Sequence, residues 1–67
     1  MKADRVEASW DKEKKNWLIR IEVGGEVIRR HYEAPQTADD QTLRTAVETT
    51  TADEGYEIAA ANIALRR

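Results

Sequence analysis

The chain has no cysteine, no phenylalanine, one proline and one histidine among its 67 residues. Without cysteine a disulfide-stabilised fold cannot form, and a lone histidine does not supply the ligands of a zinc site. The longest uncharged run, from Ile58 to Leu65, is far too short to cross a bilayer. These absences exclude a disulfide scaffold, a zinc domain and a transmembrane helix.

Large apolar side chains are also scarce. Of the 27 apolar residues, ten are alanines and one is Met1. A domain of this length buries only about 60% of its unfolded surface. We therefore expect a single small domain over residues 1–67, of marginal stability and without a sizeable buried active site.

Charge is distributed unevenly along a chain whose net charge is −2. Residues 1–33 carry a balance of +1, residues 34–65 carry −5, and Arg66 and Arg67 add +2. A generic nucleic-acid binder is usually basic, so this balance disfavours one. No apolar segment of a signal peptide follows Met1, and with the absence of cysteine this predicts a cytoplasmic protein.

Two β-hairpins are predicted from alternating apolar residues. Residues 6–10 and 17–23 alternate with the period of two that is typical of half-buried strands. The Gly24-Gly25 pair lies between two β-branched runs and predicts a two-residue turn, because such turns need positive φ angles. This turn sets Ile21 opposite Ile28.

The other hairpin closes across the polar loop 11–16 with Trp10 opposite Trp17. In a chain without phenylalanine, we expect these two rings to supply most of the core volume. The two registers agree on one apolar face, which contains Val6, Ala8, Trp10, Trp17, Ile19, Ile21, Val23, Ile28 and Tyr32. On the opposite, solvated face the registers pair Glu7 with Arg20 and Arg5 with Glu22.

A helix is predicted after Pro35, with Thr37 as its N-cap and acidic residues in its first turn. Gly55 fits the position just after the helix, where a left-handed residue ends it. The apolar stripe of this helix is expected to consist of Leu43, Ala46, Val47 and Thr50.

The last segment, Tyr56–Arg67, leaves two alternatives open. Its four alanines favour a second helix, which would give a βββαα fold. Tyr56, Ile58 and Ala60 instead alternate as in a strand, directly after a glycine. We prefer the strand, which predicts an α+β fold of order β-β-β-α-β, with a three-stranded antiparallel meander and one helix on one face of the sheet.

The last strand could lie beside either the first or the third strand. Beside the first, the order 3-2-1-4 is similar to that of the reduced ribonuclease-H-like modules of HicB-type antitoxins. No residue motif carries this likeness, and element order by itself does not imply a function. We therefore assign no family.

No catalytic, cofactor or metal site can be assembled from the sequence. His31 is predicted on the solvated face without an orienting acid or a nucleophile. The acid pairs Asp39-Asp40 and Asp53-Glu54 are better explained by helix ends than by calcium ligation. Gly24-Gly25 lacks the following helix and lysine of a phosphate loop. We expect neither an enzyme nor a cofactor.

A basic face of the sheet is the remaining candidate for binding. Arg20 and Arg29 lie opposite each other in the predicted register, which is unfavourable unless an anion or a carboxylate lies between them. Arg30 falls on the apolar face and is expected to reach water or to pair with Glu48 or Asp53. The candidate binding residues are Arg20, Arg29, His31, Leu18, Val27, Arg66 and Arg67. The apolar residues left over on the solvated face are Leu18, Val27 and either Ile63 or Leu65.

Protein–protein association, above all self-association as a homodimer, is the function that we expect. The core is small, and at least one strand edge stays unpaired in a monomer. The alternative is a nucleic-acid-linked regulator, antitoxin-like or RNA/DNA-binding, that uses the basic face. A small enzyme is a third alternative with the least support.

Overall fold

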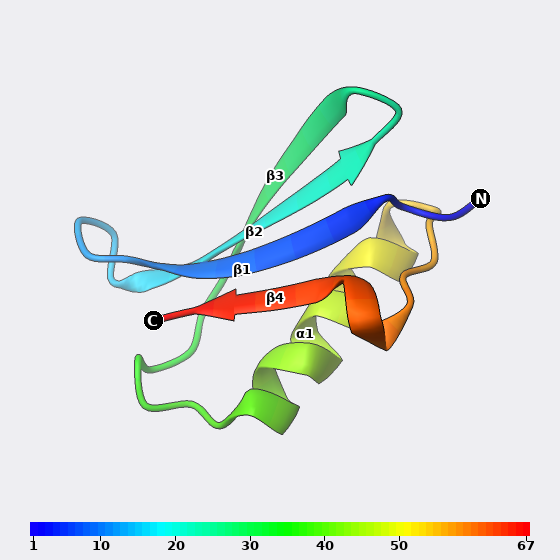
Figure 1. Ribbon diagram of the computed structural model, residues 1–67. Coiled ribbons are helices and arrows are strands. Elements are labelled where there is room, and N and C mark those ends of the chain that lie inside the picture. The colour runs from blue at the N-terminus through cyan, green and yellow to red at the C-terminus, as the bar shows by residue number, and fades with distance from the viewer.

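The computed structural model describes residues 1–67 and shows one four-stranded sheet with a single α-helix against it (Figure 1). The strand order is β3-β2-β1-β4, in which β4 runs parallel to β1 and the other neighbours are antiparallel. The expected β-β-β-α-β order is therefore confirmed, with the last strand beside the first. The elements are β1 (Arg5–Asp11), β2 (Asn16–Val23), β3 (Glu26–Tyr32), α1 (Asp40–Asp53), the 3-10 helix η1 (Ala60–Asn62) and β4 (Ile63–Arg66).

Both predicted hairpin registers are confirmed. Gly24 and Gly25 have φ angles of 55° and 87°, as a type I′ turn requires, and Ile21 lies opposite Ile28. At the other end of the meander Trp10 lies opposite Trp17. Their ring centroids are 5.6 Å apart in an edge-to-face arrangement, which aromatic pairs favour.

The helix begins two residues later than its sequence predicts. Thr37 is not the N-cap, because residues 35–38 form a turn in which the N–H of Ala38 bonds to the carbonyl of Pro35. Asp39 caps α1 instead, and its carboxylate accepts a 2.8 Å hydrogen bond from the N–H of Thr42. Both residue types are good N-caps, so the preceding turn decides between them.

At its other end, α1 stops where the sequence predicts. Gly55 has a φ of 87°, and its N–H bonds to the carbonyl of Ala52 while the N–H of Tyr56 bonds to that of Thr51. These two bonds form a Schellman motif. The buried stripe contains Thr51 in place of the expected Thr50, because Thr51 follows Leu43 and Val47 at the four-residue spacing and bonds its hydroxyl to the Val47 carbonyl.

The fourth strand exists, but not where Tyr56, Ile58 and Ala60 predict it. Residues 56–58 form only an isolated bridge, in which Glu57 exchanges backbone hydrogen bonds with Met1 and Ala3. The alanines then form η1, and β4 starts at Ile63. The expectation that Ile63 or Leu65 is left on the solvated face is wrong, because they lie opposite Val6 and Ala8 and so face the core.

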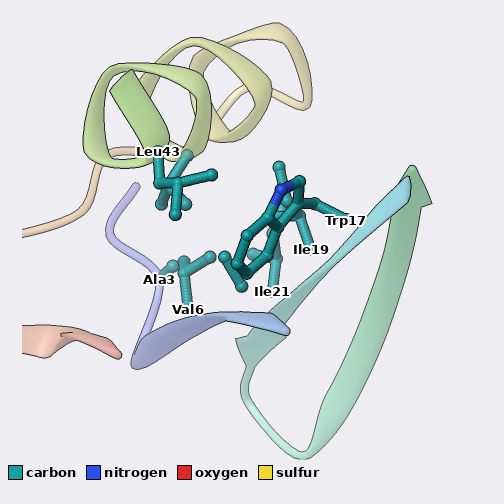
Figure 2. Packing of buried hydrophobic residues seen from close by; sticks show 8 residues of the cluster. Ala3, Val6, Trp17, Ile19, Ile21 and Leu43 are labelled. Atoms are coloured by element: carbon teal, nitrogen blue, oxygen red, sulfur yellow. The ribbon is translucent and has the colours of Figure 1, made fainter. Parts of the chain in front are cut away.

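The core lies between α1 and the strands β1 and β2, as Figure 2 shows for Leu43 above Val6, Ile19 and Ile21. Trp17 is completely buried, whereas Trp10 is half-buried at the margin. The indole N–H of Trp17 donates a 3.1 Å hydrogen bond to the carbonyl of Pro35. The helix packs against β1, β2 and β4, while β3 rises away from it (Figure 1).

The Asp39 cap makes helix stability pH-dependent. Hydrogen bonds from the side chain and backbone of Thr42 lower the pKa of Asp39 from its usual value near 3.8. A lowered pKa in the folded state means that the cap stabilises the fold above the unfolded pKa and is lost as the pH falls through the folded one. We expect Asp39→Ala to melt below the parent at pH 7, and the difference to shrink as the pH falls through the lowered pKa of Asp39.

The control is Asp39→Asn, because asparagine caps a helix about as well as aspartate and does not titrate. Thermal melts followed by circular dichroism should place this variant close to the parent at neutral pH and above both other proteins in acid, where the cap of the parent is protonated. A difference between the parent and Asp39→Ala that persists unchanged in acid would contradict the assignment of the cap.

Candidate functional site

The sheet face away from α1 is open to solvent and carries most of the predicted binding residues. In the centre of this face, Arg29, Arg20, Glu7 and Ala64 form one row across the four strands. The neighbouring row brings together His31, Leu18, Ser9 and Arg66. The structure thus places six of the seven candidate residues on this face: Arg20, Arg29, His31, Leu18, Val27 and Arg66.

Glu7 is the centre of the charges on this open face. Its carboxylate oxygens lie 3.0 Å from Arg66 Nε, 3.5 Å from Arg5 Nη2 and 3.7 Å from Arg20 Nη1. The side chain of Glu7 is only 12% exposed, because the three guanidinium groups surround it. The predicted Arg5–Glu22 pair also forms, at 3.4 Å. The sequence indicated only the Glu7–Arg20 contact, since Arg66 depends on where β4 begins.

Arg29 differs from the other arginines of the open face. It is exposed, lies directly opposite Arg20 and makes no ion pair with a carboxylate. Asp11, at the far end of β1, is engaged in the adjoining turn by the N–H groups of Glu13 and Lys14. The body of the face therefore holds four arginines and two glutamates, a balance of +2 on a chain with a net charge of −2.

Arg67 does not belong to this face, contrary to the grouping expected from the sequence. The strand alternation turns Arg66 to the open face and Arg67 to the helix side. There Arg67 bonds to the carbonyl of Gln36 at 2.7 Å and to Asp40 at 2.8 Å, and its guanidinium lies 5.7 Å from the centroid of the Trp17 ring. Its role in the structure is to fasten β4 to the start of α1.

A second surface lies on the helix side, where α1 leaves β3 uncovered. An open groove of about 700 Å³ separates Tyr32 from one flank of the helix. The residues that line the groove are mainly threonines and aspartates: Thr42, Thr45, Thr49, Thr50, Asp39 and Asp53. His31 points to the other face of the sheet, so the groove contains no histidine that could act on a hydroxyl.

Arg30 lies on the same side of β3 as Tyr32 and binds the end of α1. Its Nε and Nη2 atoms bind the two oxygens of Glu54 at 3.2 and 2.8 Å, in a bidentate pair. The expected partners Glu48 and Asp53 are therefore wrong, because the Schellman turn brings Glu54 toward β3. The remaining group, Nη1, donates a 2.8 Å hydrogen bond to the backbone carbonyl of Arg29.

No group of three or more His, Cys, Asp or Glu side chains is arranged to hold a metal ion. The helix α1 is neither long nor apolar enough to cross a membrane. Comparison with protein families, with curated proteins and with solved structures finds nothing that matches this chain. The exposed surfaces and strand edges of the fold are therefore the basis for inferring a function.

A Glu7 variant tests whether this carboxylate holds the three arginines of the open face in place. Glu7→Gln removes the charge that holds three arginines close together, so we expect the free energy of unfolding to fall by about 1 kcal/mol. For a domain of this size that lowers the melting temperature by about 4–8 °C. High salt should reduce the difference, because it screens the remaining repulsion.

The matched control is Glu13→Gln in the exposed β1–β2 loop, where we expect a change within about 0.5 kcal/mol. Urea unfolding at low and high salt measures both variants. Equal stability of the two variants at low salt would show that the arginines are not held by Glu7.

Proposed function

We propose that this chain is a small non-enzymatic binding module that works by protein–protein association at the free edge of β3, with a second copy of itself as the expected partner. The observation that carries the proposal is that β3 pairs with β2 alone along all seven of its residues. An unpaired strand edge is a template for the addition of another strand. The helix does not cover this edge, since α1 packs against the other three strands.

The backbone groups available on β3 follow from the ladder. The carbonyl of Glu22 accepts a hydrogen bond from the N–H of Asp4, so Glu22 is directed toward β1. The backbone N–H and carbonyl groups of successive β2 residues point alternately to β1 and to β3. Those of Ile21 therefore point to β3 and bond with the backbone of Ile28, which lies opposite. The residues of β3 whose N–H and carbonyl groups point away from the sheet are therefore Val27, Arg29 and His31.

The other edge of the sheet is less suited to pairing. β4 has only four residues, and short edge strands are one way in which proteins prevent strand addition. Its end is also fixed by the contacts of Arg67 with Gln36 and Asp40. Along β3, by contrast, Val27 and Ile28 remain partly exposed on the two faces of the strand. These differences favour β3 as the associating edge.

Removing one outward N–H from β3 tests the proposal. In Arg29→Pro the lost N–H points to solvent, so the β2–β3 ladder stays intact while strand addition loses a hydrogen bond and meets the proline ring. We expect the mass of the parent to rise from 7.7 kDa toward twice that value with concentration, and that of Arg29→Pro to stay at 7.7 kDa.

Arg29→Ala is the matched control, because it removes the same side chain but keeps the N–H group. Sedimentation equilibrium at several concentrations compares the three proteins, and circular dichroism checks that each is folded. A parent that remains a monomer at millimolar concentration and captures no partner strand would overturn the proposal.

A second candidate function is the binding of a nucleic-acid backbone by the open face. The specific observation that favours it is that Arg29 faces Arg20 and has no carboxylate partner of its own, an arrangement that a phosphate group would stabilise. The face has no exposed aromatic ring for base stacking, so contact would be limited to phosphates and independent of sequence.

Salt dependence separates this candidate from the first. The double variant Arg20→Glu/Arg29→Glu should lose binding to single- and double-stranded oligonucleotides, and the affinity of the parent should fall steeply between 50 and 200 mM salt. The control Lys12→Glu/Lys14→Glu makes the same charge change in the β1–β2 loop. If the arginine variant binds as tightly as the parent, the open face is not a nucleic-acid site.

A further inference from the structure

We infer that the partner is a second copy of this chain, added antiparallel along β3 in the register that places Ile28 opposite the partner's Ile28. The inference rests on the proposed function, because it needs β3 to be the associating edge. It adds the symmetry, the register and the residues that recognise each other. The result would be one continuous eight-stranded sheet with both helices on the same side.

The ladder geometry restricts the choice of register. A two-fold axis perpendicular to the sheet keeps both cores on the same side, and it must also bring outward-directed residues opposite one another. In registers centred on Ile28, Arg29 or Arg30, at least five residues of each strand are paired. Registers centred nearer the ends of β3 pair three residues or fewer.

Charge then selects among the three registers. Centring on Arg29 sets this arginine opposite the partner's Arg29, and centring on Arg30 does the same for Arg30. Like charges directly opposite are destabilising. Centring on Ile28 avoids both repulsions and brings Arg30 opposite the partner's Glu26, an attraction that the two-fold axis repeats.

The same register keeps the hydrogen bonds of Arg30 satisfied. In the single chain Arg30 Nη1 donates to the carbonyl of Arg29, which is one of the outward-directed groups. In the proposed dimer the N–H of the partner's Val27 would donate to that carbonyl. The carboxylate of the partner's Glu26 would accept a hydrogen bond from Nη1. Glu54 retains the other two guanidinium contacts, so the exchange costs no buried pairing.

Apolar burial adds to this charge complementarity. Ile28 packs at the margin of the core and stays partly exposed, because α1 does not cover β3. Its symmetric pairing with the partner's Ile28 would join the two core margins across the interface. Residues that belong to non-hydrogen-bonded pairs have the shortest separation in an antiparallel ladder, and Ile28 is such a residue toward the partner.

A cysteine scan identifies the register, since the chain has no cysteine of its own. The single variants Ile28→Cys, Arg29→Cys and Arg30→Cys are oxidised under mild conditions, and the rate of disulfide-linked dimer formation is measured. We expect Ile28→Cys to cross-link at least about tenfold faster than the other two, because only there do two identical residues face each other at short distance.

The outcomes separate this inference from the proposed function. Fastest cross-linking at Arg29 or Arg30 would overturn the register while leaving association through β3 in place. Slow cross-linking at all three positions, with a parent mass that still rises with concentration, would place self-association elsewhere on the chain. A parent that stays monomeric would overturn both this inference and the expected self-association.

A charge variant tests the recognition without changing the core margin. Glu26→Lys places a lysine opposite the partner's Arg30 twice per dimer, so we expect the dissociation constant to rise by about tenfold or more. The control Glu13→Lys makes the same change in the exposed loop and should leave the constant unchanged. Equal dissociation constants for the two variants would contradict the Glu26–Arg30 contact.

Discussion

The indole of Trp17 joins four separate parts of this chain: both strands of the first hairpin, the loop before α1 and the C-terminus. It is fully buried, lies edge-to-face against Trp10, donates a hydrogen bond to the carbonyl of Pro35 and lies beneath the guanidinium of Arg67. In a chain without phenylalanine this one ring connects both hairpins to the loop before α1 and to the last strand. The position of the helix over β1, β2 and β4 depends on these contacts.

That position of the helix determines which surfaces remain for function. Because a single helix of 14 residues covers three strands, β3 keeps a partly exposed inner face, and its place at the end of the strand order leaves its outer edge free. The charges are sorted at the same time: arginines gather on the open sheet face, and acidic residues lie along α1 and its ends. A chain with a small core thus presents an edge and a charged face, which are the two surfaces that the proposed functions use.

The sequence predicts the meander well and the C-terminal third less well, for physical reasons. Period-two alternation and a Gly-Gly turn define the register of β2 and β3 with little freedom, because a slip of one residue would expose the apolar face. The alanines at 59–61 carry no such pattern, so the start of β4 at Ile63 depends on the backbone contacts of Glu57 with the N-terminal residues. For the same reason Arg67 is predicted on the wrong face: which residues of β4 face the helix depends on where the strand begins. The pairing of Arg30 with Glu54, instead of with the predicted Glu48 or Asp53, depends on the shape of the Schellman turn.

The parallel pairing of β1 with β4 also bears on how the chain folds. Each hairpin joins residues that are close in sequence, whereas Val6 and Ile63 lie at opposite ends of the chain. Local contacts form faster, because closing a long loop costs more chain entropy. We therefore expect the meander to form first and β4 to dock last, together with α1. Until β4 docks, β1 is itself an open edge strand, so the nascent chain has two unpaired edges and the folded chain has one long one.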